Sequence, residues 1–127
     1  MRKPLLLVLF WVLSLPAFAD PTMECDEPSQ VEIAECVSAT LDRVDGAVLA
    51  ALGLARNAMA ELDRVTGREV AAPALEQSQT AWAAFRDAQC EAVGASYGGG
   101  SGTGIAITAC RIELGRARVT KLLNLAQ

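Results

Sequence analysis

The chain is 127 residues long, carries 11 Lys and Arg against 15 Asp and Glu, and contains no histidine. The excess of acidic residues argues against nucleic-acid binding, which needs a basic surface to neutralise the phosphate backbone. The lack of histidine excludes Ser-His-Asp and Cys-His nucleophilic catalysis. The length fits one small domain.

The first nineteen residues have the pattern of a secretory signal peptide. Two basic residues and an apolar run over residues 5–15 precede Ala17-Phe18-Ala19, which stands directly before Asp20. The apolar run is shorter than the roughly 20 residues that span a bilayer, so a retained membrane anchor is the less favoured interpretation. We expect residues 1–19 to be removed. Residues 20–127 should then form a single helical domain, periplasmic or secreted and free of the membrane.

All four cysteines lie within residues 20–127. An even number of cysteines in a small exported domain predicts a disulfide framework. Three connectivities are possible, and short intervening segments favour the pairs Cys25–Cys36 and Cys90–Cys110. Each pair would contribute roughly 3 kcal/mol in the chain-entropy model. A zinc site is the rival interpretation, but it requires closer cysteine spacings or histidines, so we expect no metal ion.

The first predicted helix begins after Ser29, which forms a capping box with Glu32. Apolar residues then recur at spacings of three and four and form one helical stripe: Ile33, Val37, Leu41, Val44, Val48, Leu52, Ala55, Met59 and Leu62. Gly46 and Gly53 interrupt the pattern, since each costs about 1 kcal/mol relative to alanine. The helix should end near Thr66-Gly67, where glycine suits the C-terminal cap.

A second helix should begin near Pro73, a residue suited to the first helical turn. Trp82 and Phe85 are three residues apart and therefore share a face. They are the only Trp and Phe residues after position 19, so we expect both to anchor the core; stacking of a ligand on Trp82 is the alternative. Arg86 and Asp87 are expected to form ion pairs or hydrogen bonds in the helix packing rather than to act in catalysis.

Residues 98–104 are rich in glycine and are predicted to form a flexible loop. They lack the G-K-[ST] ending and the preceding strand of a phosphate-binding loop. A third helix should run from about Ile105 to Leu125. Three helices with short links should pack antiparallel, which predicts an all-α, three-helix, up-down-up bundle. This arrangement would gather the four cysteines at one end.

A set of residues spread over most of the region after position 19 forms a recognisable pattern. It consists of Cys36 with Asp45 nine positions later, the block Gln79-x-x-Trp82-x-x-Phe85-Arg86-Asp87-x-x-Cys90, then Gly99-Gly100-Ser101, Cys110 and Arg118. This pattern resembles the lysozyme inhibitor LprI-like family (N-terminal domain) of exported helical proteins. Val48-Leu49 stands where the family usually has Leu-Asn, and Leu52 where an aromatic residue is common.

The resemblance implies an exported protein that binds another protein, and most directly a lysozyme inhibitor that acts on a basic lysozyme. An acidic protein would be attracted to such an enzyme. The glycine-rich loop offers the hydroxyls of Tyr97, Ser101 and Thr103 as candidate contacts with the partner; alternatively, it only links two helices. The alternative function is a periplasmic structural or interaction module with another protein partner. We expect neither catalytic residues nor a cofactor, because paired carboxylates would also need a substrate cleft.

Overall fold

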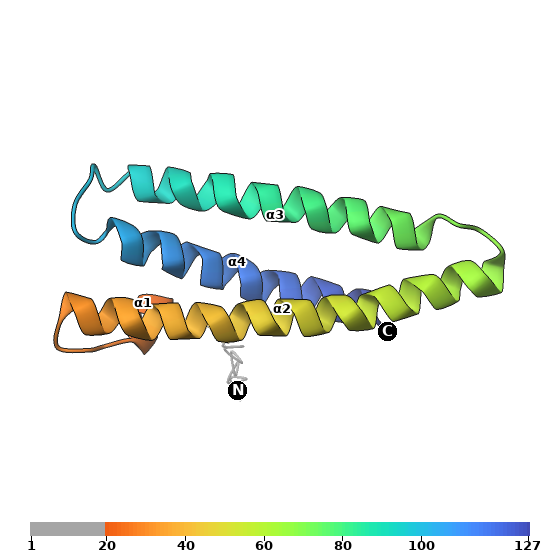
Figure 1. The fold of residues 1–127 in the computed structure, drawn as a ribbon, viewed down its shortest axis with the longest axis horizontal. Helices are drawn as coiled ribbons and strands as arrows, with labels where there is room; N and C mark the ends of the chain where they lie inside the picture. Colours follow the sequence, from red (N-terminus) through yellow and green to blue (C-terminus); the bar gives the residue numbers. More distant parts are fainter. Residues whose placement is uncertain (1–19) are drawn as a thin grey trace, which may run out of the picture.

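The computed structural model describes residues 20–127; residues 1–19, with the predicted signal peptide, lie outside the described part of the chain. The described residues form four α helices, shown in Figure 1: α1 (Pro21–Glu24), α2 (Gln30–Thr66), α3 (Ala71–Ala95) and α4 (Thr103–Leu125). The predicted all-α fold is confirmed, and no strand occurs within residues 20–127. The short helix α1 is an element that the sequence did not predict.

The three long helices lie side by side, and each runs opposite to the one before it (Figure 1). Helix α4 packs against both α2 and α3, while α1 lies beside the first turns of α2 and also contacts α4. Helix α2 is the longest, with 37 residues, and its C-terminal turns extend toward the α2–α3 turn at the far end of the molecule (Figure 1).

Both ends of α2 agree with the sequence prediction. The Ser29 hydroxyl accepts a hydrogen bond from the backbone N–H of Glu32 at 3.2 Å and donates one to the Glu32 carboxylate at 2.6 Å. At the other end Gly67 adopts a left-handed conformation with φ of 66°, which is accessible to glycine at little cost. Local capping signals in the sequence therefore account for both ends of α2.

Helix α3 begins at Ala71, two residues before the predicted start at Pro73. The cap comes from the preceding helix: the Asp63 carboxylate accepts hydrogen bonds from the backbone N–H groups of Val70 (3.1 Å), Ala71 (2.9 Å) and Ala72 (2.9 Å). These bonds lower the pKa of Asp63, with those from Ala72 and Ala71 contributing most. One side chain thus satisfies three amide groups at the start of α3 and fixes the turn between α2 and α3.

Two glycines lie where α4 closely approaches its neighbouring helices. A Cβ atom on Gly94 of α3 would lie 2.5 Å from Cγ1 of Ile107 in α4. A Cβ atom on Gly115 of α4 would lie 2.5 Å from Cγ1 of Val44 in α2. Both distances are far below van der Waals contact, so the spacing of α4 from its two neighbours depends on these glycines.

The core lies between the three long helices and is drawn largely from the predicted stripe on α2. Two clusters of buried residues form it: Val48, Ala51, Leu52, Ala55, Leu75 and Leu122 in one, and Cys25, Val37, Val44 and Ile112 in the other. The stripe ends earlier than predicted, because Leu62 is 50% exposed.

The prediction that Phe85 anchors the core is wrong. Phe85 is 53% exposed, whereas Trp82 is half-buried and packs against the first cluster. The inward face of α3 follows positions 75, 79, 82, 86 and 90, all buried or half-buried. The spacing after Trp82 is therefore four residues, so Arg86 rather than Phe85 lies on the inward face.

Two disulfides join the elements in the pairing that the short intervening segments favoured. Cys25 and Cys36, with Cα atoms 5.7 Å apart, tie the segment after α1 to α2. Cys90 and Cys110, with Cα atoms 5.5 Å apart, tie α3 to α4. Within residues 20–127, none of the helices is long and apolar enough to cross a membrane.

Candidate functional site

The motif residues that lie far apart in the sequence meet at the junction of α2, α3 and α4. Asp45 comes from α2, Trp82 and Arg86 from α3, and Arg118 from α4. Arg86 Nη1 donates a hydrogen bond to Asp45 Oδ1 at 2.7 Å. The guanidinium carbons of Arg86 and Arg118 lie 4.7 Å and 5.6 Å from the centre of the Trp82 ring. We call these four residues the tryptophan junction.

The local sequence of α3 builds this junction. Gln79, Trp82 and Arg86 are spaced three and four residues apart, so they project from one face of the helix. Arg118 of α4 reaches that face and donates hydrogen bonds to Gln79 Oε1 at 2.9 Å and to Ser78 Oγ at 3.2 Å. The junction therefore fixes the position of α3 relative to both neighbouring helices.

The two arginines of the junction are largely removed from solvent. The Arg86 side chain is only 18% exposed, and its Nε is buried without a hydrogen-bond partner among residues 20–127. Burial lowers the pKa of Arg118, although a guanidinium remains charged at any physiological pH. Stacking on the face of Trp82 compensates part of this desolvation. The residues of the tryptophan junction thus stabilise the helix packing through stacking and charge pairing.

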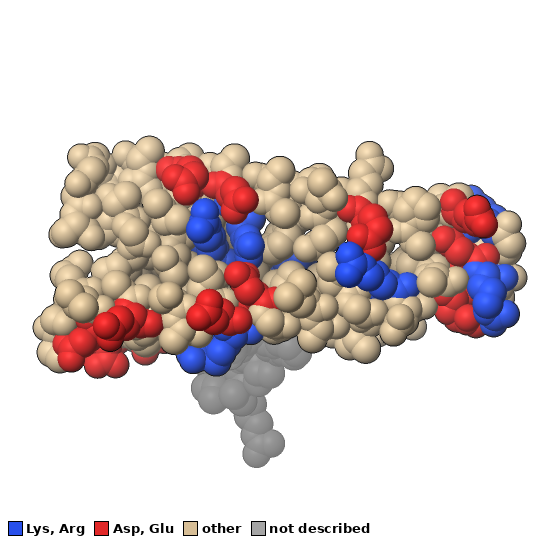
Figure 2. Space-filling view, viewed as in Figure 1, with Lys and Arg blue, Asp and Glu red and all other residues tan. Residues whose placement is uncertain are grey.

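Arg86 and Asp87 take part in helix packing, but with different partners. Adjacent positions on a helix do not face each other, and Asp87 lies 3.7 Å from Arg111 of α4 rather than beside Arg86. Arg111 also lies 3.4 Å from Glu91. Arg111 was not among the predicted residues. Its position directly after Cys110, and so opposite the acidic residues near Cys90, is the sequence signal that could have identified it. Figure 2 shows basic side chains between acidic ones on this face.

The predicted flexible loop has a defined set of hydrogen bonds. Gly98 and Gly99 have φ values of 63° and 82°, a conformation that favours glycine. The backbone N–H of Gly100 donates to the carbonyl of Tyr97 at 3.3 Å. Thr103 is already the first residue of α4, and its hydroxyl donates to the carbonyl of Gly100 at 2.7 Å. The loop is therefore shorter than predicted, and the Thr103 hydroxyl is engaged within it.

The three candidate partner-binding residues do not line a single depression. Tyr97 is 55% exposed and lines a depression of about 290 Å³ beside Cys110 and Glu113. Ser101 lines a different groove, along α2. The loop that carries them lies at one end of the molecule, where α3 and α4 turn back on each other (Figure 1).

Among residues 20–127, no group of three or more Cys, Asp or Glu side chains is placed to hold a metal ion. The cysteines are all oxidised to disulfides.

Comparison with known proteins gives a consistent result. A family model described as "Lysozyme inhibitor LprI" matches residues 23–122. An uncharacterized protein of Rhizobium meliloti (strain 1021) is 39% identical over 54 residues, which are 42% of this chain and 39% of that protein. The chain thus matches well under half the length of that relative. No solved structure matches the chain.

Proposed function

The chain belongs to the lysozyme inhibitor LprI family, and from this premise we propose that it is an exported protein that binds a basic lysozyme and inhibits it. The observation that carries the proposal is the family match over residues 23–122, which includes every residue of the tryptophan junction. Removal of residues 1–19 as a signal peptide and folding of residues 20–127 as one domain are part of this proposal. Two disulfides support export, since disulfides persist in oxidising compartments.

In this proposal the protein acts by binding, and it is not an enzyme. The tryptophan junction holds α3 in place, and the Cys90–Cys110 disulfide joins α3 to α4 close to the loop between them. A loop supported in this way loses little conformational entropy on binding. We propose that the loop enters or covers the lysozyme cleft, with Tyr97 and Ser101 making the contacts.

A cell-lysis assay tests the proposed function. The oxidised protein, purified after export, is added to lysozymes of several types, and the clearing of a bacterial suspension is followed. We expect inhibition of at least one basic lysozyme. Failure to inhibit or bind any of them would contradict the proposal and favour a structural or interaction module with another partner.

The loop is tested in the same assay with the double variant Tyr97→Ala/Ser101→Ala. We expect inhibition to weaken about tenfold, which corresponds to about 1.4 kcal/mol of binding free energy. Gln77→Ala is the matched control, because Gln77 is exposed on α3 away from the loop. Equal inhibition by the loop variant and the wild type would contradict the role of the loop and leave the proposed function intact.

A further inference from the structure

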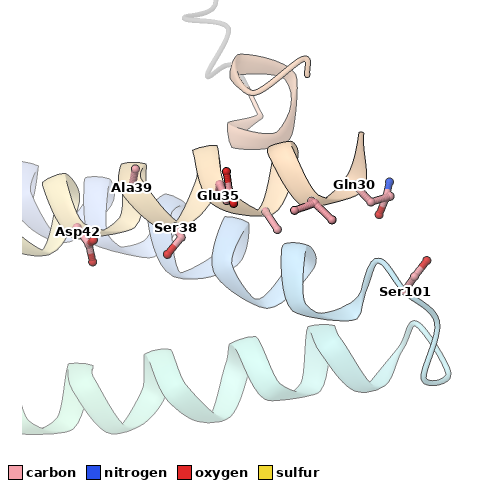
Figure 3. Close-up of a pocket in the computed structure, with 8 residues that line it drawn as sticks. Gln30, Glu35, Ser38, Ala39, Asp42 and Ser101 are labelled. Atoms are coloured by element: carbon pink, nitrogen blue, oxygen red, sulfur yellow. The ribbon is translucent and has the colours of Figure 1, made fainter. Parts of the chain in front are cut away.

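A shallow groove with a volume of about 680 Å³ runs along the first half of α2. Figure 3 shows the residues that line it, most of them on α2, with Ser101 on the loop that connects α3 and α4. Val31, Ala34 and Ala39 contribute apolar surface, and Glu35 and Asp42 add two carboxylates. We call this feature the α2 groove.

The α2 groove lies on a face of the helix that the rest of the described chain leaves uncovered. Positions 31, 35, 38 and 42 are spaced four, three and four residues apart and so form one stripe. All four are exposed, and Val31 is 68% exposed. The stripe of α2 that faces the core includes Val37 and Val44 instead. Val31, Ala34 and Ala39 thus leave a small apolar surface beside the carboxylates of Glu35 and Asp42.

The excess negative charge of the described chain lies in the sequence segment that includes the groove. Residues 20–42 contain seven Asp and Glu and no Lys or Arg, whereas residues 43–127 contain nine Lys and Arg against eight Asp and Glu. The net negative charge of the described chain therefore comes entirely from residues 20–42. In Figure 2 acidic side chains cover the start of α2, and the basic side chains lie farther along the molecule.

The two carboxylates of the groove are available to a partner. Six other acidic residues form ion pairs within residues 20–127; among them, Glu24 pairs with Arg116, Asp45 with Arg86, and Glu76 with Arg56. Glu35 and Asp42 form no ion pair with any residue in 20–127. Charge complementarity thus calls for a partner that presents Lys or Arg.

We infer that the α2 groove is the docking surface for a convex, basic element of the lysozyme, an inference that rests on the proposed function. An inserted Lys or Arg side chain would lay its aliphatic stem over Val31 and Ala34. Its charged head would then reach Glu35 or Asp42, where charge-assisted hydrogen bonds are strong. Ser101 belongs both to this groove and to the α3–α4 loop, so a partner seated in the groove would also meet the loop at Ser101.

The test is a charge reversal with a matched control. Glu35→Lys/Asp42→Lys reverses both carboxylates of the groove. Glu61→Lys/Glu69→Lys changes the net charge by the same amount at two exposed positions near the α2–α3 turn, outside both the groove and the depression lined by Tyr97. The full chain is expressed, and the exported, oxidised protein is titrated calorimetrically into a basic c-type lysozyme that the wild type inhibits; circular dichroism verifies the fold of each variant.

We expect the groove variant to bind about 100-fold more weakly, because like charges placed opposite each other in an interface repel. The control variant should lose less than about fivefold, through weaker long-range attraction alone. Equal losses of affinity in the two variants, or wild-type affinity in the groove variant, would contradict docking in the α2 groove and leave the proposed function intact. Absence of binding by the wild type to any lysozyme would overturn both.

A steric variant gives an independent readout that leaves the charge unchanged. Ala34→Trp fills the groove, and Ala84→Trp places the same side chain at an exposed position on α3. Loss of binding in Ala34→Trp alone supports docking in the groove. Unchanged binding by Ala34→Trp would contradict it.

Discussion

The guanidinium groups of Arg86 in α3 and Arg118 in α4 both contact the ring of Trp82, so this ring connects α3 to α4. The hydrogen bond from Arg86 to Asp45 connects α3 to α2. Cation–π contacts contribute about 0.5–1 kcal/mol at exposed sites and about 2 kcal/mol when desolvated. The Arg86–Asp45 bond adds less by itself, because Asp45 is 44% exposed and solvent screens the pair. The junction thus stabilises the packing mainly through the burial of Trp82 and the stacking upon it.

Asp63 supplies a stability contribution that depends on pH. Its folded-state pKa is lowered by hydrogen bonds from the backbone N–H groups of Ala72, Ala71 and Val70. A lowered pKa means that the contribution is complete above the ordinary aspartate value, about 3.9, and is lost as the pH falls through the folded-state value. Asp63→Asn should therefore lower the urea midpoint of unfolding at about pH 7, and the difference from wild type should shrink at about pH 2.5.

The control for this measurement is Asp26→Asn, since Asp26 is exposed and makes no hydrogen bond within the described residues. It should unfold at the wild-type urea concentration at both pH values. A difference between Asp63→Asn and wild type that persists unchanged at low pH would show that the carboxylate charge is not what caps α3.

At the scale of elements, the helices could be predicted because their signals are local. Ser29 and Glu32 mark the start of α2 and Gly67 its end, and periodicity identifies the face that holds Val37 and Val44. The cap of α3 could not be predicted, because it comes from Asp63 on the preceding helix. The helix α1 has only four residues, too few for a periodic pattern to appear.

The site was harder to predict than the fold. The spacing of Trp82 and Phe85 does not say which of the two faces inward. The packing of α3 against α2 and α4 buries Trp82, places Arg86 beside Asp45 of α2 and leaves Phe85 exposed. The motif block indicated which residues matter, but their contacts lie 39 to 41 residues apart in sequence. Contacts between residues so far apart leave no signature in a single sequence.

The glycines of the helices allow a prediction about element packing. Gly115→Ala would place a Cβ 2.5 Å from Cγ1 of Val44, whose β-branched side chain has little freedom to move. We expect a loss of about 1–3 kcal/mol in the free energy of unfolding, as is typical of overpacked sites. Gly46→Ala meets no atom within 4 Å, so it should stabilise the protein by up to about 1 kcal/mol through helix propensity.

Urea unfolding of both variants, followed by circular dichroism at the helical minimum, measures these changes. Each variant adds the same methyl group to a long helix, so the sign of the difference reports on the environment alone. A stable Gly115→Ala variant would contradict the close approach of α2 and α4.

At the scale of the whole molecule, the protein is long and thin, and its core is made of few large side chains. The largest fully buried side chains are Ile112, Leu122, Val37, Pro21 and the two cysteines Cys25 and Cys90. An elongated bundle has a high ratio of surface to volume and buries less apolar surface than a compact domain of equal length. Cross-links compensate for a small core by limiting the entropy of the unfolded chain.

The two disulfides enclose chain segments of different length, and we therefore expect them to contribute unequally to the free energy of unfolding. Cys90→Ala/Cys110→Ala opens a separation of 20 residues between α3 and α4 and should lower the free energy of unfolding by about 3 kcal/mol. Cys25→Ala/Cys36→Ala opens a separation of 11 residues, so its chain-entropy loss is smaller by about 0.5 kcal/mol. It also releases only the segment around α1, and the three long helices should keep their contacts. Urea unfolding should therefore show a larger drop in midpoint for the first variant, and the reverse order would contradict the view that the α3–α4 cross-link stabilises the bundle as a whole.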